Sequence, residues 1–268
     1  MRPLSLLSFA VAALWLAAAS SAPALETGKT ITMVADNWCP FNCDPADTDP
    51  GFLVEVAQKA FEPEGYKVTY QIVPWARAIE EVMAGKYTIL LAASVEETPD
   101  VLFPKSPRVS CGFDVFVKEG NPFVWKGVDS IRDKRIGGVQ DYMYSEAVNA
   151  YIEANKNAPG HKVQIQHGDE SLPTNIKKLL GGRIDVLFEN SAVLTHKFHT
   201  MGDELADLGL SGKPHYVGSA DDKPTDCYLG FSPARPDSHQ LMELLAKRGA
   251  EMEADGTMAK LRDKYGIQ

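Results

Sequence analysis

The sequence predicts an α/β fold, because short apolar strands alternate with amphipathic helices from residue 31 onward. Apolar runs at 31–35 and 88–94 and a period-two alternation over 66–73 are typical of strands. Between them, 52–61 and 75–84 carry apolar residues at helical spacing. Strands and helices that alternate in this way indicate βαβ units and mainly parallel sheets.

The same pattern begins again after Gly120-Asn121-Pro122. The further predicted elements are one strand over 109–117, a short helix at 130–134, strands at 135–139, 163–165 and 184–188, helices at 144–152 and 174–180, then a strand at 227–231 and helix over 236–265. A lone strand with trailing helix makes a poor third domain, so we expect it to return to the first. The predicted lobes are 25–114 with 226–268, and 115–225, joined by two crossing strands.

The N-terminal segment is typical of a secretory signal peptide over residues 1–24. It joins Arg2 to an apolar run over 4–19 and the small-residue site Ala22-Pro23-Ala24. A retained membrane anchor is the alternative. No later stretch approaches the ~20 apolar residues of a membrane span, so we expect an exported protein without membrane insertion. The net charge of −9 argues against a nucleic acid partner.

The four cysteines are even in number, which in an exported chain favours disulfides. Cys39 and Cys43 are close enough to bridge across a turn, leaving Cys111 and Cys227 as the second pair. Adjacent crossing strands would bring that second pair together. A metal site built on Cys-x3-Cys is the alternative, but it has no matching second pair and no nearby His. We therefore expect two disulfides, no metal and no cofactor.

Six short motifs follow one another along the chain: Trp38-Cys-Pro-Phe41, Gly51-Phe-Leu-Val-Glu55, Ala84-Gly-Lys-Tyr87, Gly182-Arg-Ile-Asp185, Leu229-Gly-Phe-Ser232 and the segment 255–265. In these motifs and their order the chain resembles the periplasmic solute-binding proteins of ABC importers, polar amino acid-binding type. The resemblance implies a two-lobed periplasmic binding protein fold (type II), each lobe a mainly parallel sheet flanked by helices, with two hinge strands. It also implies a periplasmic monomer that serves an inner-membrane ABC permease.

Two positions depart from the pattern of the family that the chain resembles. That family's amino acid binders carry an Arg that clamps the ligand's α-carboxylate, and spacing from Phe103 places Glu97 there in this chain. The family's Asp in its Gly-Lys-aromatic-Asp turn is replaced by Thr88. The resemblance therefore implies an atypical member whose ligand is not an ordinary α-amino acid.

Arg77, Trp38 and Trp75 are the first candidates for ligand contact. Arg77 lies off the apolar stripe of its helix, and a guanidinium there suits a carboxylate or phosphate. The alternative is an ion pair with Glu80 or Glu81. Trp38 suits stacking on a ligand, or packing under the Cys39 turn. Trp75 either contacts the ligand or packs in the core with Ile79 and Met83, which lie on the same stripe of its helix.

Other candidates follow predicted strands or begin helices, where ligands of α/β folds bind. They are Asp36, Asn37, Ser94, Tyr142, Ser145, Glu189 and Asn190. For Asp36 the alternative is capping of the following turn, and for Asn190 it is capping of a helix N-terminus.

The leading functional hypothesis is a non-catalytic protein that closes its two lobes on a small polar or anionic molecule. An enzyme on the same fold, similar to the cyclohexadienyl dehydratases, is the second hypothesis, with Glu97 or Glu189 as general acid. A third is an accessory protein that docks on a periplasmic redox enzyme or a sensor kinase.

Overall fold

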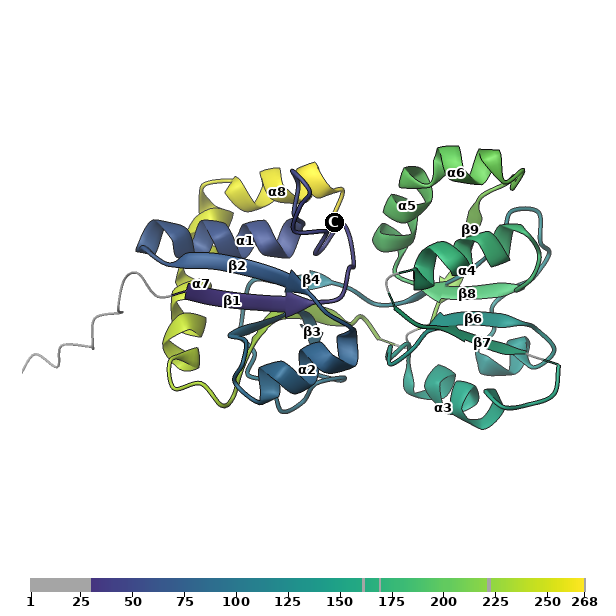
Figure 1. Ribbon diagram of the computed structural model, residues 1–268, viewed down its shortest axis with the longest axis horizontal. Helices are drawn as coiled ribbons and strands as arrows, with labels where there is room; N and C mark the ends of the chain where they lie inside the picture. The colour runs from purple at the N-terminus through teal and green to yellow at the C-terminus, as the bar shows by residue number, and fades with distance from the viewer. Residues whose placement is uncertain (1–29, 161, 169, 221–222, 268) are drawn as a thin grey trace, which may run out of the picture.

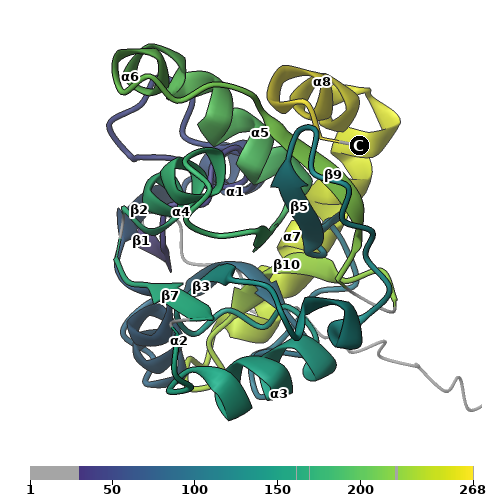
Figure 2. The same ribbon diagram turned by 90° about the vertical axis from the view of Figure 1, so that its right-hand side faces the viewer.

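The computed structural model describes residues 30–160, 162–168, 170–220 and 223–267, and the predicted signal peptide lies outside them. The chain forms two lobes, each built on a five-stranded sheet (Figure 1). Helices lie on both sides of each sheet. In the first lobe α1 and α8 lie above the sheet and α2 below, and in the second α5 and α6 lie above and α3 below (Figure 1 and Figure 2). The predicted α/β class is confirmed.

The first sheet has the strand order β2-β1-β3-β10-β4, with β1 parallel to both of its neighbours and β10 antiparallel to β3 and β4. Its elements are β1 (Thr30–Ala35), α1 (Phe52–Phe61), the 3-10 helix η1 (Glu62–Glu64), β2 (Lys67–Ile72), α2 (Trp75–Met83), β3 (Ile89–Ser94), β4 (Arg108–Ser110), β10 (Asp226–Phe231), α7 (Ser238–Ala254) and α8 (Thr257–Tyr265).

The second sheet has the order β7-β6-β8-β5-β9, with β6 parallel to β7 and β8 and with β5 antiparallel to β8 and β9. Its elements are β5 (Asp114–Lys118), the 3-10 helix η2 (Val128–Ile131), β6 (Ile136–Val139), α3 (Glu146–Asn155), β7 (Val163–Gln166), α4 (Ser171–Leu180), β8 (Val186–Glu189), α5 (Ser191–Thr200), α6 (Gly202–Asp207) and β9 (Pro214–Ser219).

Apolar periodicity explains why these segments form layers. On α1 the stripe of Leu53, Val56 and Ala60 is buried, and β3 is buried along both faces except at Ala92. A central parallel strand covered on both faces takes such a continuous apolar run. Each sheet is thus packed inside its own lobe, which leaves strand ends to face the other lobe.

The predicted single strand over 109–117 is wrong. Its first part forms β4, which pairs with β10, and the chain leaves the first sheet at Cys111. From Asp114 onward it forms β5, which pairs with β8 and β9 in the second sheet. One straight strand cannot serve two separate sheets, so the ladder breaks at Cys111–Phe113. The segment after β9 returns to β10 and makes the second crossing. Periodicity showed the apolar residues but not the break between them.

The last predicted helix, 236–265, is two helices. Gly256 adopts φ 78°, a left-handed conformation that ends the α-helical ladder between α7 and α8. Strand β9 was not predicted, because it lies at the sheet edge and its residues are partly exposed and lack an apolar pattern. None of the described helices is both long and apolar enough to cross a membrane.

Both predicted disulfides are present, Cys39 with Cys43 and Cys111 with Cys227. The second bridge lies where the chain passes between lobes, and it ties the end of β4 to β10. The expected adjacency of the two crossing segments explains this pairing, because β4 and β10 are hydrogen-bonded neighbours with Val109 opposite Cys227.

Candidate ligand-binding cleft

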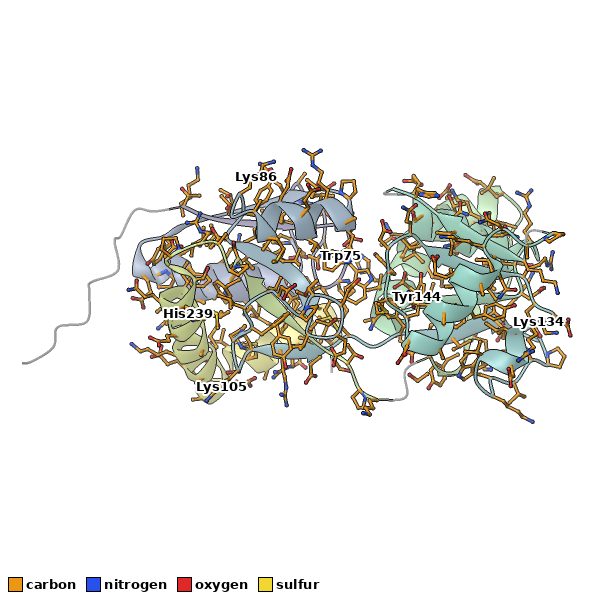
Figure 3. The ribbon with its side chains drawn as sticks, turned by 90° about the horizontal axis from the view of Figure 1, so that it is seen from below. Trp75, Lys86, Lys105, Lys134, Tyr144 and His239 are labelled. Carbon is orange, nitrogen blue, oxygen red and sulfur yellow. A yellow bond between two sulfur atoms is a disulfide. The ribbon has the colours of Figure 1, made fainter. Side chains whose placement is uncertain are left out.

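The carboxyl ends of the parallel strands in both sheets meet between the lobes. In the first sheet β1 ends before Asp36 and β3 ends at Ser94, and in the second sheet β6 ends at Val139 and β8 at Glu189. This is the edge at which open α/β sheets bind ligands. Trp75 lies at the edge of the first lobe that faces the second, and Tyr144 lies on the facing lobe (Figure 3).

Two adjoining cavities occupy this space. The inner cavity is about 40 Å³ and the outer about 280 Å³, near the lower end of small-molecule sites. Both are lined by Asp36, Trp38, Trp75 and Tyr142. The inner one adds Ala92, Ser94, Glu97, Cys111, Phe113, Met143, Thr225 and Cys227, and the outer one adds Asn37, Pro74, Val139, Gln140, Asp141, Gln166, His167, Gly168, Ser171, Leu172 and Glu189. We call the two cavities together the cleft.

Trp38 stands on a tight loop that leaves little freedom to its backbone. The backbone N–H of Trp38 donates to the carbonyl of Asn42 at 2.9 Å, and the Cys39–Cys43 disulfide closes the same turn. The fully buried Asn42 amide donates to the carbonyl of Asp36 at 2.6 Å. The indole stacks on Phe41 with ring centres 4.9 Å apart. The loop therefore presents Trp38 to the cleft in a fixed position.

Gly51 is required for this loop to pack. It adopts φ 112°, and a Cβ atom there would lie 2.6 Å from the carbonyl oxygen of Phe41. The main chain at the start of α1 thus lies directly against the Trp38 loop. Only glycine permits that approach at that dihedral angle.

Two side-chain hydrogen bonds cross from the first lobe to the second. The indole Nε1 of Trp38 donates to Oε1 of Glu189 at 3.1 Å, and the hydroxyl of Tyr142 donates to Oδ2 of Asp36 at 2.7 Å. All four residues were predicted as ligand contacts from their sequence positions. The structure brings them together around the cleft and shows the lobes closed on it.

Glu97 lines the inner cavity, although the sequence suggested it only as a replacement for the clamping Arg and as a possible general acid, not as a ligand contact. It follows β3 in a turn where its N–H donates to the hydroxyl of Ser94 at 3.3 Å. Its carboxylate accepts the indole N–H of Trp75 at 2.8 Å and a backbone hydrogen bond from Met143 of the other lobe. The end of a parallel strand was the sequence signal that could have placed Glu97 among the ligand contacts.

The buried carboxyl groups of the cleft hold their protons more tightly than in water. Burial, opposed by the hydrogen bond from Trp75 and helped by the nearby charge of Asp36, raises the pKa of Glu97 to about 7. Burial likewise raises the pKa of Glu189 to about 7, opposed by hydrogen bonds from Asn190 and Trp38. Desolvation disfavours the charged form of a carboxyl group, which accounts for the direction.

The remaining predicted contacts are placed as follows. Trp75 is both core and cleft, since its ring packs with Ala78 and Val82 and also lines both cavities. Ser94 lines the inner cavity and Asn37 the outer. Phe113, which also lines the inner cavity, was hidden in the break between β4 and β5.

Three candidates lie elsewhere. Arg77 is exposed on α2, lines neither cavity, and pairs with Glu81 at 2.9 Å, the alternative considered for it. Ser145 caps α3 by accepting from the N–H of Val148 at 3.3 Å. Asn190 caps α5, its side-chain oxygen accepting from two backbone N–H groups.

Two larger, more open hollows adjoin the cleft. One, about 970 Å³, lies between α5 and the end of α8 and is lined by Asn190, His196, His199 and Lys264 among others. The other, about 950 Å³, runs along α3 and reaches Glu97 and Tyr142. Among the residues that the structure describes, no three His, Cys, Asp or Glu side chains gather as a metal site.

Residues 31–268 match the family model described as bacterial extracellular solute-binding proteins, family 3. The chain belongs to this family. The predicted resemblance is confirmed, and the two lobes with their cleft are the type II binding-protein fold.

Members of this family and its fold are similar to the chain over nearly its whole length. The L-cystine-binding protein TcyJ of Escherichia coli strain K12 is 22% identical over 244 residues, covering 90% of this chain and 83% of TcyJ. A structure from work on glutathione import via GshT and the cystine importer TcyBC of Streptococcus mutans aligns with TM-score 0.66 and 21% identity, covering 89% and 95% of the two chains. The ancestral amino acid-binding protein AncCDT-1, a precursor of cyclohexadienyl dehydratase, aligns with TM-score 0.59 and 21% identity, covering 88% and 95%.

Proposed function

We propose that this solute-binding protein works in the periplasm, where it captures a small polar molecule between its lobes and delivers it to an inner-membrane ABC permease. The observation that carries the proposal is the closed cleft, with Trp38 bonded to Glu189 and Tyr142 to Asp36 across it. Binding groups divided between two lobes couple ligand capture to closure about the connecting segments. A permease can then distinguish the closed, loaded form from the open one.

The proposed lobe boundaries are those expected from the sequence, 25–114 with 226–268 and 115–225. Closure then bends the two connections at Cys111–Phe113 and next to β10. The Cys111–Cys227 bridge ties these connections together on the side of the first lobe. We propose a monomer, because each chain supplies both walls of its own cleft.

Ligand capture is tested by thermal denaturation of the purified protein against a broad metabolite library. A ligand at 100 times its Kd adds about 2.7 kcal/mol to the unfolding free energy and raises Tm visibly. Native mass spectrometry of the same preparation identifies any molecule that co-purifies. A library in which no compound raises Tm, together with a spectrum of the bare chain alone, would contradict capture.

Delivery to a permease is tested in the source organism. Deletion of the gene is expected to abolish uptake of the radiolabelled ligand, and the wild-type gene restores it. Unchanged uptake in the deletion strain would instead favour docking on a sensor or a redox enzyme.

A periplasmic lyase is the second candidate, favoured by the raised pKa of Glu97 beside the inner cavity. A carboxyl group with a pKa of about 7 suits general acid catalysis near neutral pH. The relevant assay is incubation with prephenate followed by product analysis. Turnover that disappears in Glu97→Gln would establish the enzyme, and no turnover leaves the binding protein.

A further inference from the structure

The charge of the cleft lining identifies the class of molecule it accepts, if the proposed function holds. Asp36 lines both cavities, Glu97 the inner one and Glu189 the outer one. Among the described residues that line the two cavities there is no lysine or arginine, and the exposed His167 is the one titratable base. Asp141 also lines the outer cavity, so the described walls of the cleft carry four carboxyl groups and no lysine or arginine.

The hydrogen bonds that the cleft residues make among themselves also favour a ligand rich in donors. The indole N–H groups of Trp38 and Trp75 are both donated to protein carboxylates, and an indole has only one such donor. The hydroxyl proton of Tyr142 is donated to Asp36. A carboxylate can accept about four hydrogen bonds, so each acid keeps acceptor capacity. A ligand that supplies hydrogen-bond donors is therefore matched by the acids, whereas an anion would find both indole N–H groups and the Tyr142 hydroxyl engaged.

The aromatic rings add a second source of attraction. Trp38, Trp75 and Tyr142 line both cavities, and Phe113 lines the inner one. The faces of aromatic rings attract ammonium groups, and indoles do so most strongly. Aromatic walls combined with carboxylates are a binding surface for organic cations rather than for carboxylic or phosphoric acids.

We propose that the cleft holds a small organic cation, a primary or quaternary amine without a carboxylate group, whose ammonium lies beside Asp36 against the Trp38 and Trp75 indoles. Asp36 is central because it alone among the four acids of the lining borders both cavities. The outer cavity of about 280 Å³ suits a molecule at the small end of the range of ligand sites. Asp36 also raises the pKa of both Glu97 and Glu189, a mutual repulsion that a bound cation would relieve.

Isothermal titration calorimetry of the full-length mature protein with three groups of probes tests this inference. The cations are putrescine, cadaverine and choline, the zwitterions are lysine and cystine, and the anions are glutamate and succinate. We expect saturable binding of at least one of the cations, and binding at least about tenfold weaker for every zwitterion and anion. Failure of all three cations to bind overturns the inference.

The other probes separate that failure from failure of the proposed function. If cations fail while a zwitterion or an anion binds, capture of a small molecule stands and only the cation class falls. If no probe and no library compound binds, both fall.

Variants then locate the ammonium group. Asp36→Asn and Glu97→Gln keep the size of each side chain and remove its charge, and each is expected to weaken cation binding at least about tenfold, the effect of one charge-assisted hydrogen bond. Glu96→Gln is the matched control, because Glu96 is the exposed neighbour of Glu97 and lines neither cavity. It should bind as the wild type does. Circular dichroism confirms folding of each variant, and unchanged affinity in both folded cleft variants overturns the placement.

Discussion

The indole nitrogen of Trp38, on the loop after the first strand of one lobe, lies 3.1 Å from the buried carboxylate of Glu189 at a strand end of the other. The two residues are 151 positions apart in the chain. Glu189 also accepts the backbone N–H of Asn190 at 2.8 Å. One carboxylate thus joins the end of its own strand to the opposite lobe, and closure of the cleft depends on it.

Trp38→Phe removes this donor and keeps an aromatic ring on the loop. The loss of this hydrogen bond leaves a buried acceptor unsatisfied and destabilises the closed form by roughly 1 to 3 kcal/mol. We therefore expect small-angle X-ray scattering of the ligand-free variant to give a larger radius of gyration than wild type. Trp125→Phe is the control, since Trp125 packs against Phe188 within the second lobe. An unchanged radius would show that the bond does not hold the lobes together.

Glu189 makes the stability of the ligand-free protein depend on pH. Its carboxyl group has a pKa of about 7 when folded, against an ordinary value of 4.5. Between these values the folded chain keeps a proton that the unfolded chain releases, so the contribution of this group to the unfolding free energy falls as pH rises. The fall is complete above pH 7 and reaches up to about 3 kcal/mol.

Urea denaturation of wild type and Glu189→Gln from pH 4 to 8 measures this effect. The amide keeps an acceptor for Trp38 but does not titrate. Wild type should lose stability relative to the variant through this window, and a constant difference between the two would contradict the buried, protonated carboxyl group.

Arg77→Ala is expected to leave ligand affinity unchanged. The guanidinium is exposed on α2 and pairs with Glu81, away from both cavities. Exposed ion pairs of this kind contribute little to stability, so the unfolding free energy should also stay close to that of wild type. Calorimetry with whichever ligand the library identifies, and urea denaturation, check the two expectations. A tenfold loss of affinity would mean that Arg77 reaches the ligand after all.

The two disulfides should have different effects when removed. Replacing Cys111 and Cys227 by serine opens a loop closed over 116 residues and is expected to cost about 2 to 5 kcal/mol of unfolding free energy. Replacing Cys39 and Cys43 opens a loop of four positions, so the entropic loss is smaller. Its main effect is weaker ligand binding, because the Trp38 turn loosens. Urea midpoints and calorimetry on both double variants test the contrast, and equal losses of stability would contradict it.

Apolar periodicity predicted the βαβ units and the two lobes because a strand or helix buries one recognisable pattern of side chains. Strand ends selected Asp36 and Glu189 for the cleft, a helix start selected Tyr142, and the capacity of an indole to stack selected Trp38. Apolar periodicity failed at 109–117, because a chain segment that passes from one sheet to the other keeps the apolar pattern of a single strand. It also failed for Arg77, because helical spacing states which face a residue occupies but not what that face meets.

The sequence by itself determined the α/β class, most of the elements, the family and the pairing of cysteines, all of which depend on local pattern or on the number of possible pairs. Only the tertiary structure decided which polar groups share the cleft and with what charge. Trp38 and Glu189, or Trp75 and Glu97, become partners through the docking of one lobe on another or of a loop on a helix. Such contacts arise from three-dimensional packing of distant segments, and no periodicity along the chain encodes them.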